Sequence, residues 1–147
     1  MRFVCDVMLG KLAKYLRLLG FDAVYAPSPA SLERYKQQES DRVLLTRRKG
    51  DTGFPTTIRL TSEKTREQLM EMRGLIKSRI DAESVLNRCI ECNTPLVEVE
   101  KTEIESLVPE FVYHNYSRFK TCPTCRRVYW EGSHTIGMEN LIKEMLA

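Results

Sequence analysis

No run of apolar residues in the sequence approaches the ~20 residues that a membrane-spanning helix requires. Apart from a duplicated Cys-x-x-Cys motif, the sequence has no internal repeat, and it has no low-complexity tract. The opening segment, MRFVCDVMLGKLAKYL, alternates apolar and charged residues and has no signal-peptide cleavage site, so we expect a cytoplasmic protein. With 147 residues and an ordinary apolar fraction, the chain has room for one globular domain, or for a small domain plus a metal-held module.

A disulfide framework is not expected either, because of how the five cysteines are distributed. Four of them form two Cys-x-x-Cys pairs, Cys89 with Cys92 and Cys122 with Cys125, and Cys5 stands alone in an apolar run. Paired cysteines at this spacing are typical of a metal site, whereas disulfide frameworks are typical of short exported domains. A reducing compartment is consistent with this interpretation.

The two pairs predict a structural zinc site. Each pair presents two thiolates on one tight turn, and together they supply the four ligands of a closed tetrahedral Zn²⁺ site. A redox dithiol would be expected as a single pair at the start of a helix. His114 and His134 are further candidate ligands, although four cysteines already complete the shell. A metal also suits a segment of about 60 residues, which cannot bury enough apolar surface to be firmly stable alone.

Charge is unevenly divided along the chain. Residues 1–80 carry 16 Lys and Arg against 9 Asp and Glu, a net charge of +7, whereas residues 81–147 carry 7 against 11, a net charge of −4. A basic half indicates a polyanionic partner such as RNA or DNA. Small basic domains are also common without such a partner, so charge alone leaves both interpretations open.

The first part of the chain alternates strand and helix patterns. Apolar segments at residues 2–6, 21–25, 42–46 and 56–60 predict strands, and residues 8–19, 30–39 and 61–78 predict helices. Gly20 is suited to end the first helix, and Thr61 or Ser62 to begin the third. This order favours a parallel α/β sheet, in which ligands bind outside the carboxyl ends of the strands. Asp6 and the loop at residues 46–51 stand at such ends.

The pattern changes after about residue 86. Residues 96–100, 111–116 and 128–130 predict short ribbon strands, residues 101–107 a short helical insertion, and residues 137–146 a final helix. We therefore expect an α/β domain over residues 1–86 and a zinc-held module with a terminal helix over residues 87–147.

Several motifs together resemble the mut-seven C-terminal RNase domain family. They are CDVMLGKLAKYLRLLGFD at residues 5–22, VLLTR at 43–47, RCIECNTPL at 88–96, VP at 108–109, FKTCPTCRRVYWEGSH at 119–134, and Met138. The resemblance covers nearly the whole chain in the right order. It implies a PIN-like nuclease fold followed by a zinc ribbon.

The resemblance also implies a chemistry. PIN-type nucleases are ribonucleases in which several carboxylates hold Mg²⁺ or Mn²⁺, and hard divalent ions prefer such oxygen ligands. The ions would activate a water and neutralise charge on the phosphodiester during an in-line displacement. Asp6 matches the first metal-binding aspartate of the family, although an aspartate before an amphipathic helix is also typical of an N-cap.

The chain departs from the family at its second acidic position. The family pattern at the end of the central strand is Leu-Thr-Arg-Asp, whereas this chain has Leu45-Thr46-Arg47-Arg48, so a cation replaces an expected metal ligand. Nearby carboxylates are candidates to compensate, and each is also interpretable as a solvated surface group. They are Glu33, Glu39, Asp41 and Asp51.

Cations at the same strand end indicate RNA binding, because Lys and Arg bind the phosphate backbone. The candidates are Lys11, Lys14, Arg17, Arg47, Arg48 and Lys49. Our hypothesis is a ribonuclease-family protein that binds RNA and cleaves it weakly or not at all.

Two other functions remain open at this point. One is a non-catalytic RNA-binding module stabilised by zinc, in which Tyr129 and Trp130 stack on bases. Trp130 is equally interpretable as a core residue between ribbon and sheet. The other is an adaptor that docks a protein partner through an acidic ribbon face formed by Glu98, Glu100, Glu103 and Glu105.

Overall fold

A four-stranded parallel sheet forms the first part of the protein. The computed structural model describes residues 1–133 and 136–147. The strands are β1 (Arg2–Cys5), β2 (Asp22–Tyr25), β3 (Val43–Thr46) and β4 (Thr57–Arg59), in the spatial order β2-β1-β3-β4. The parallel α/β sheet expected from the sequence is therefore confirmed.

Helices cover both faces of this sheet. The 3₁₀ turn η1 (Val7–Leu9) leads into α1 (Gly10–Leu18), which packs with α3 (Thr65–Ile76) and α5 (Ile136–Leu146) on the face that carries Phe3, Cys5 and Leu45. Helix α2 (Pro29–Gln38) covers the other face, where Val4 and Leu44 are buried. Adjacent residues of β1 thus point to opposite layers, as the period of two requires in a sheet buried on both sides.

Helix α1 ends where its sequence predicts. Leu12 and Leu16 pack against the sheet, and Gly20 follows the helix with φ of 93°. A Cβ at Gly20 would lie 2.7 Å from the carbonyl oxygen of Ser84, so both the backbone conformation and the space require glycine there.

A loop without a helix joins β3 to β4. It spans residues 47–56 and turns at Gly50 and Gly53, which both have positive φ. Because β1 and β3 are parallel neighbours, the start of this loop lies beside the carboxyl end of β1, where Arg48 reaches Asp6. Asp6 and the basic loop therefore lie at the same edge of the sheet.

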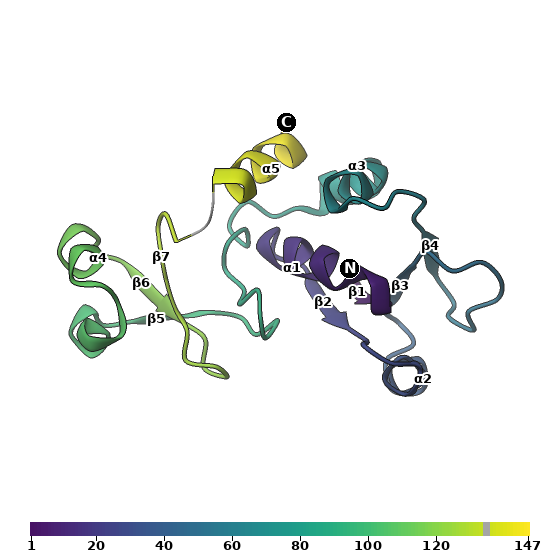
Figure 1. Cartoon of the computed structure of the whole chain (residues 1–147), viewed down its shortest axis with the longest axis horizontal. Coiled ribbons are helices and arrows are strands. Elements are labelled where there is room, and N and C mark those ends of the chain that lie inside the picture. Colours follow the sequence, from purple (N-terminus) through teal and green to yellow (C-terminus); the bar gives the residue numbers. More distant parts are fainter. Residues whose placement is uncertain (134–135) are drawn as a thin grey trace.

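The second part of the chain is an antiparallel ribbon. Its strands are β5 (Val97–Val99), β6 (Phe119–Thr121) and β7 (Val128–Trp130), in that spatial order. Between β5 and β6 the chain forms the 3₁₀ turns η3 (Lys101–Glu103) and η4 (Glu105–Leu107) and the short helix α4 (Glu110–Asn115). Figure 1 shows this ribbon beside the parallel sheet, with α4 at its far end.

Two expectations about local structure were wrong. Residues 111–116 form most of α4 rather than a strand, and the strand that pairs with β5 is β6 instead. Helix α3 begins at Thr65, and neither Thr61 nor Ser62 caps it. The backbone N–H groups of those two residues donate instead to the carboxylate of Glu71, so that the loop before α3 is tied to the helix side chain.

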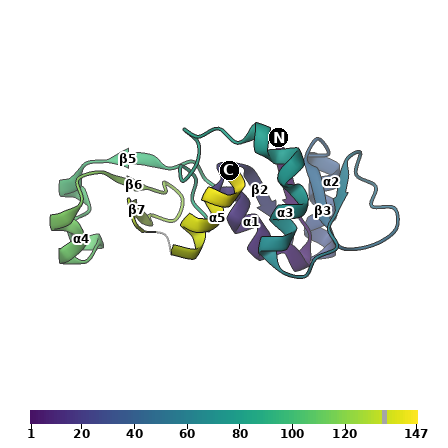
Figure 2. The ribbon, with the colours of Figure 1, turned by 90° about the horizontal axis from the view of Figure 1, so that it is seen from above.

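The final helix returns to the first core. Leu141 and Met145 of α5 are buried in the same cluster as Leu12, Leu69 and Met72. Figures 1 and 2 both show α5 next to α3, between the ribbon and the sheet. No helix in the described part of the chain has the length and apolar character needed to cross a membrane.

Candidate functional site

The four paired cysteines converge as the sequence predicts. Their Sγ atoms all lie within 4.8 Å of one another, and the Sγ atoms of Cys89 and Cys125 are 3.7 Å apart. Zn–S bonds of ~2.3 Å in a tetrahedron require S···S separations of ~3.8 Å. The residues therefore fit a zinc ion, which Cys89, Cys92, Cys122 and Cys125 would hold.

The two cysteine pairs adopt matching turns. The N–H groups of Cys92 and Cys125 donate to the Sγ of Cys89 and Cys122, each over 3.4 Å. Asn93 and Arg126, which follow the pairs, have φ of 64° and 67°. Such turns aim both thiolates of a pair at one point.

Of the two candidate histidines, His114 is described by the structure and does not join this cluster. His114 lies on α4, where its exposed ring faces Glu110 at 3.7 Å. His134 lies outside the described residues.

The first cysteine pair docks on the edge of the parallel sheet. Asn93 Oδ1 accepts a hydrogen bond from the backbone N–H of Ala23 at 3.0 Å, and Asn93 Nδ2 donates to Asp22 at 2.7 Å. Arg17 donates to the carbonyls of Ala23 and Ile90 at 2.8 and 2.7 Å. Because β2 is an edge strand, these contacts satisfy backbone groups that would otherwise be open to another strand.

Arg17 is therefore engaged inside the protein. Its side chain is buried, with only 7% of the residue exposed, and its guanidinium hydrogen bonds go to backbone carbonyls. It also lies near Cys5, whose pKa burial raises to about 12, an effect that the charge of Arg17 partly opposes. The sequence grouped Arg17 with the RNA-binding cations, but the structure gives it no surface for a phosphate.

Glu39 and Asp41 lie at the other end of the sheet from Asp6. Both carboxylates accept from Arg2 in the first position of β1, at 3.3 and 3.2 Å. Arg42, buried just before β3, donates to Asp22 at 2.8 Å. These groups form an ion-pair network at the amino ends of the strands, so the structure does not bring Glu39 or Asp41 together with Asp6. Glu33 lies on α2, where it pairs with Lys36 rather than with Asp6.

Asp6 is buried at the carboxyl end of β1, with 3% of the residue exposed. Its Oδ1 accepts from the N–H of Val7 at 2.8 Å, which makes Asp6 the N-cap of η1. Oδ2 accepts from Thr46 Oγ1 at 2.8 Å, and Oδ1 also accepts from Arg48 Nη2 at 2.8 Å. Both carboxylate oxygens are thus engaged by the residues that end β3.

Arg48 reaches Asp6 from the loop after β3. Its backbone N–H donates to Thr46 Oγ1 at 3.0 Å, so Thr46 links the loop to the carboxylate. The Arg48 side chain is 52% exposed, which leaves part of the guanidinium facing solvent. Arg59 holds the loop by donating to the carbonyls of Arg48 and Gly50.

The other loop residues have different environments. Arg47 is half-buried and donates to the carbonyl of Thr61 at 3.3 Å, whereas Lys49 is exposed. Asp51 is exposed and accepts from the N–H of Gly53 within the same loop. Asp51 thus belongs to the loop that begins at the Asp6 edge, and its hydrogen bond stays within that loop.

A divalent ion does not fit the residues at this edge. Asp6 is the buried carboxylate there, and a guanidinium already pairs with it. The four cysteines are the only group of three or more potential ligand side chains among the described residues. Mg²⁺ and Mn²⁺ prefer several oxygen ligands, so the carboxylate set implied by the family resemblance is not assembled here.

The two lysines of α1 lie between the basic loop and the ribbon. Lys11 is exposed in the first turn of α1, close to the Asp6 edge. Lys14, one turn later, pairs with Glu91 of the first cysteine pair at 3.2 Å. The exposed face of α1 thus connects the sheet edge with the ribbon.

The acidic residues of the ribbon lie on β5 and the turns that follow it. Glu98 pairs with Arg118 of the ribbon at 3.1 Å, and both side chains are largely exposed. Glu100, Glu103 and Glu105 are exposed in and beside η3 and η4.

Sequence reasoning missed two residues of the Asp6 site. Thr46 bridges Asp6 and the Arg48 backbone, and Arg59 fixes the loop from the neighbouring strand. The signal for Thr46 was its place at the end of a buried strand directly before two arginines. Arg59 gave no comparable signal, because its role depends on the parallel pairing of β3 with β4.

Comparison with known proteins identifies one family. The family model described as Mut7-C RNAse domain matches residues 1–142. No curated protein and no solved structure matches the chain.

Proposed function

Because the chain belongs to the Mut7-C RNase domain family, we propose that it binds RNA at the sheet edge that carries Asp6 and Arg48, with little or no metal-dependent cleavage. The observation that carries the proposal is the 2.8 Å ion pair between Arg48 Nη2 and Asp6 Oδ1. A guanidinium stands where a nuclease of this kind would need a metal ion.

The ion pair suits Arg48 to phosphate binding. One nitrogen of the guanidinium is held by the buried Asp6, and the side chain remains 52% exposed. A planar guanidinium with several donors binds phosphate oxygens well when its orientation is fixed in advance. In this proposal Asp6 orients the arginine, and Arg48 meets the RNA backbone.

Neighbouring cations extend the phosphate-binding surface. Lys49 is exposed on the same loop, and Lys11 is exposed at the start of α1. Arg47 contributes charge from a half-buried position. Charged contacts of this kind predict RNA binding that weakens as salt rises.

A second candidate is a metal-dependent ribonuclease in which Arg48 swings away from Asp6. Two observations favour it: the exposure of Arg48, and the position of Asp51 on the same loop. The loop also turns at two glycines with positive φ, which are suited to a change of backbone conformation.

One experiment separates the two candidates. The protein with its zinc retained is mixed with labelled single-stranded RNA, with Mg²⁺, with Mn²⁺, or in buffer freed of divalent ions by a resin. Binding is followed by anisotropy and cleavage by gel. We expect binding without appreciable cleavage, and weaker binding for Arg48→Ala. Strong Mn²⁺-dependent cleavage that Asp6→Asn abolishes would overturn the proposal and support the second candidate.

A further inference from the structure

Trp130 is the single tryptophan of the sequence and lies between two hollows of the ribbon. It is half-buried on β7, opposite Phe119 of β6. One hollow is a cleft of about 630 Å³ between the ribbon and α5, and the other is a groove of about 430 Å³ beside the cysteine pairs. Trp130 lines both of them, so it is not merely a core residue.

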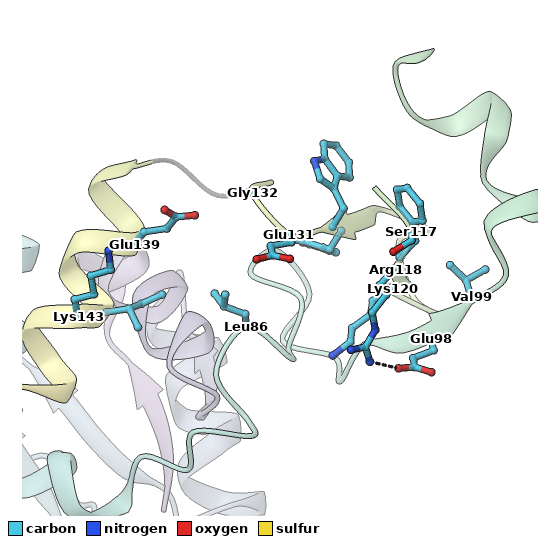
Figure 3. A pocket seen from close by; sticks show the side chains of 14 residues that line it. Leu86, Glu98, Val99, Ser117, Arg118, Lys120, Glu131, Gly132, Glu139 and Lys143 are labelled. Atoms are coloured by element: carbon cyan, nitrogen blue, oxygen red, sulfur yellow. Dashed lines mark hydrogen bonds and ion pairs between the residues drawn. The ribbon is translucent and has the colours of Figure 1, made fainter. Parts of the chain in front are cut away.

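The cleft is balanced in charge. Figure 3 shows Glu139 and Lys143 on α5 across from Glu131 on the ribbon, with Leu86 between them. The charged lining residues are Arg118, Lys120, Lys143, Glu98, Glu131 and Glu139. Three cations against three carboxylates give no net attraction for a phosphate. A cleft of this size with an aromatic side chain suits an uncharged, flat group with polar edges, such as a nucleobase.

The groove has the opposite character. Arg126 and Arg127 are exposed in its lining. Glu91 is the carboxylate of this lining, and Lys14 of α1 pairs with it. Two arginines therefore dominate the groove, within a half of the chain whose net charge is −4. Such a groove suits phosphates.

Helix α1 connects this groove with the Asp6 edge. The Lys14–Glu91 ion pair places the helix at the border of the groove, and Lys11 lies one turn closer to the start of the helix. A helix of nine residues is ~14 Å long, so only a short stretch of α1, which carries the exposed Lys11, separates the two places.

We infer that the ribbon binds a single-stranded segment of the RNA, with a base in the cleft against Trp130 and the adjoining phosphates on Arg126 and Arg127. The inference rests on the proposed function and adds to it the class of RNA and a second contact surface. A duplex could reach the arginines, but its paired bases would not be available to Trp130.

Intrinsic fluorescence tests the inference directly, because all tryptophan emission comes from Trp130. The probes are a ten-nucleotide single-stranded RNA and a duplex of the same length, added to the full zinc-loaded chain. We expect the single strand to quench the emission, with a midpoint equal to the Kd measured by anisotropy. We expect the duplex to leave the emission unchanged.

A matched pair of arginine variants tests the phosphate contact. Arg126→Ala should weaken single-strand binding and lower the slope of log Kd against log salt by about 1. Arg34→Ala is the control, because Arg34 is exposed on α2, which lies far from the ribbon in both Figures 1 and 2.

The outcomes distinguish the two proposals. RNA binding by anisotropy without any change in emission would overturn the inference and leave the proposed function standing. Equal quenching by the duplex, or equal effects of the two arginine variants, would also overturn the inference. Absence of RNA binding altogether would overturn both.

Discussion

Arg48 Nη2 lies 2.8 Å from Oδ1 of Asp6, and the carboxylate side chain is only 4% exposed. The pair joins the loop after β3 to the end of β1. A buried carboxylate that loses its cationic partner keeps its desolvation cost. The ion pair should therefore affect the stability of the fold as well as RNA binding.

Replacing Arg48 with alanine should therefore destabilise the fold. Asp6 would keep its hydrogen bonds from Val7 and Thr46, and the half-exposed arginine is partly screened, so we expect a loss of about 1–2 kcal/mol. Urea unfolding of the zinc-loaded protein measures the change. Lys49→Ala is the control, because this exposed neighbour should cost less than about 0.5 kcal/mol. Equal stabilities of the two variants would contradict the structural role of the pair.

Replacing Arg48 with aspartate should create a site for a divalent ion. Two carboxylates would then face each other beside Thr46, which destabilises the free protein and favours a bound cation. We expect Mn²⁺ to stabilise Arg48→Asp by about 1 kcal/mol at about five times its Kd, measured as a rise in Tm.

The charge change itself needs a control in that experiment. Lys49→Asp introduces the same change one residue later in the loop, away from the Asp6 hydrogen bonds. Neither it nor the natural protein should respond to Mn²⁺. A similar rise in Tm for all three proteins would show that the ion acts elsewhere.

Asn93→Gly should open the edge of β2 without removing zinc. Glycine fits the positive φ at this position, so the variant removes only the side chain, which accepts from the N–H of Ala23 and donates to Asp22. We expect faster hydrogen exchange at the Ala23 amide and an unchanged zinc content. Arg126→Gly is the matched variant in the second cysteine pair, and it should leave exchange at Ala23 unaltered.

Asp22 should make stability depend on pH in the acid range. Burial raises its pKa, but the hydrogen bonds and charge of Arg42 and the hydrogen bond of Asn93 outweigh this and lower the pKa overall. A carboxyl with a lowered folded pKa stabilises the fold above its unfolded pKa of about 3.9, and that stability is lost as pH falls toward the folded value.

Asp22→Asn tests this dependence. At pH 7 it should cost about 1–3 kcal/mol, because buried Arg42 loses one of its two charged partners and keeps only Glu39. The difference in unfolding free energy from the natural protein should narrow below about pH 4. A constant difference between pH 7 and pH 3 would argue against the ion pair.

The sequence correctly predicted those elements that depend on short, local residue patterns. β7 has the predicted bounds, and the turns of the two cysteine pairs follow from their spacing. A strand was expected at residues 111–116 because aromatic and β-branched residues generally favour strands, but this expectation was wrong. Here that segment follows Pro109 in an insertion, where it forms α4 instead.

The burial of Arg17 could not be predicted without knowing the tertiary structure. Along the helix it stands about 100° from Leu16, between the buried leucines and the lysine face. Whether such a border residue meets water or protein depends on what packs beside α1. In this fold the neighbour is the first cysteine pair, more than 70 residues later in the chain. The Arg48–Asp6 contact could not be read from the sequence either, because it depends on the pairing of β1 with β3.

The placement of Leu141 and Met145 within the first core means that this core is complete only once α5 has been synthesised. The layer formed by α1 and α3 stays incomplete until α5 is made, so the amino-terminal sheet depends on contacts of very long sequence separation. Such contacts carry a large loop-closure cost and slow folding. A bound zinc ion would shorten the effective loop by tying the ribbon together first.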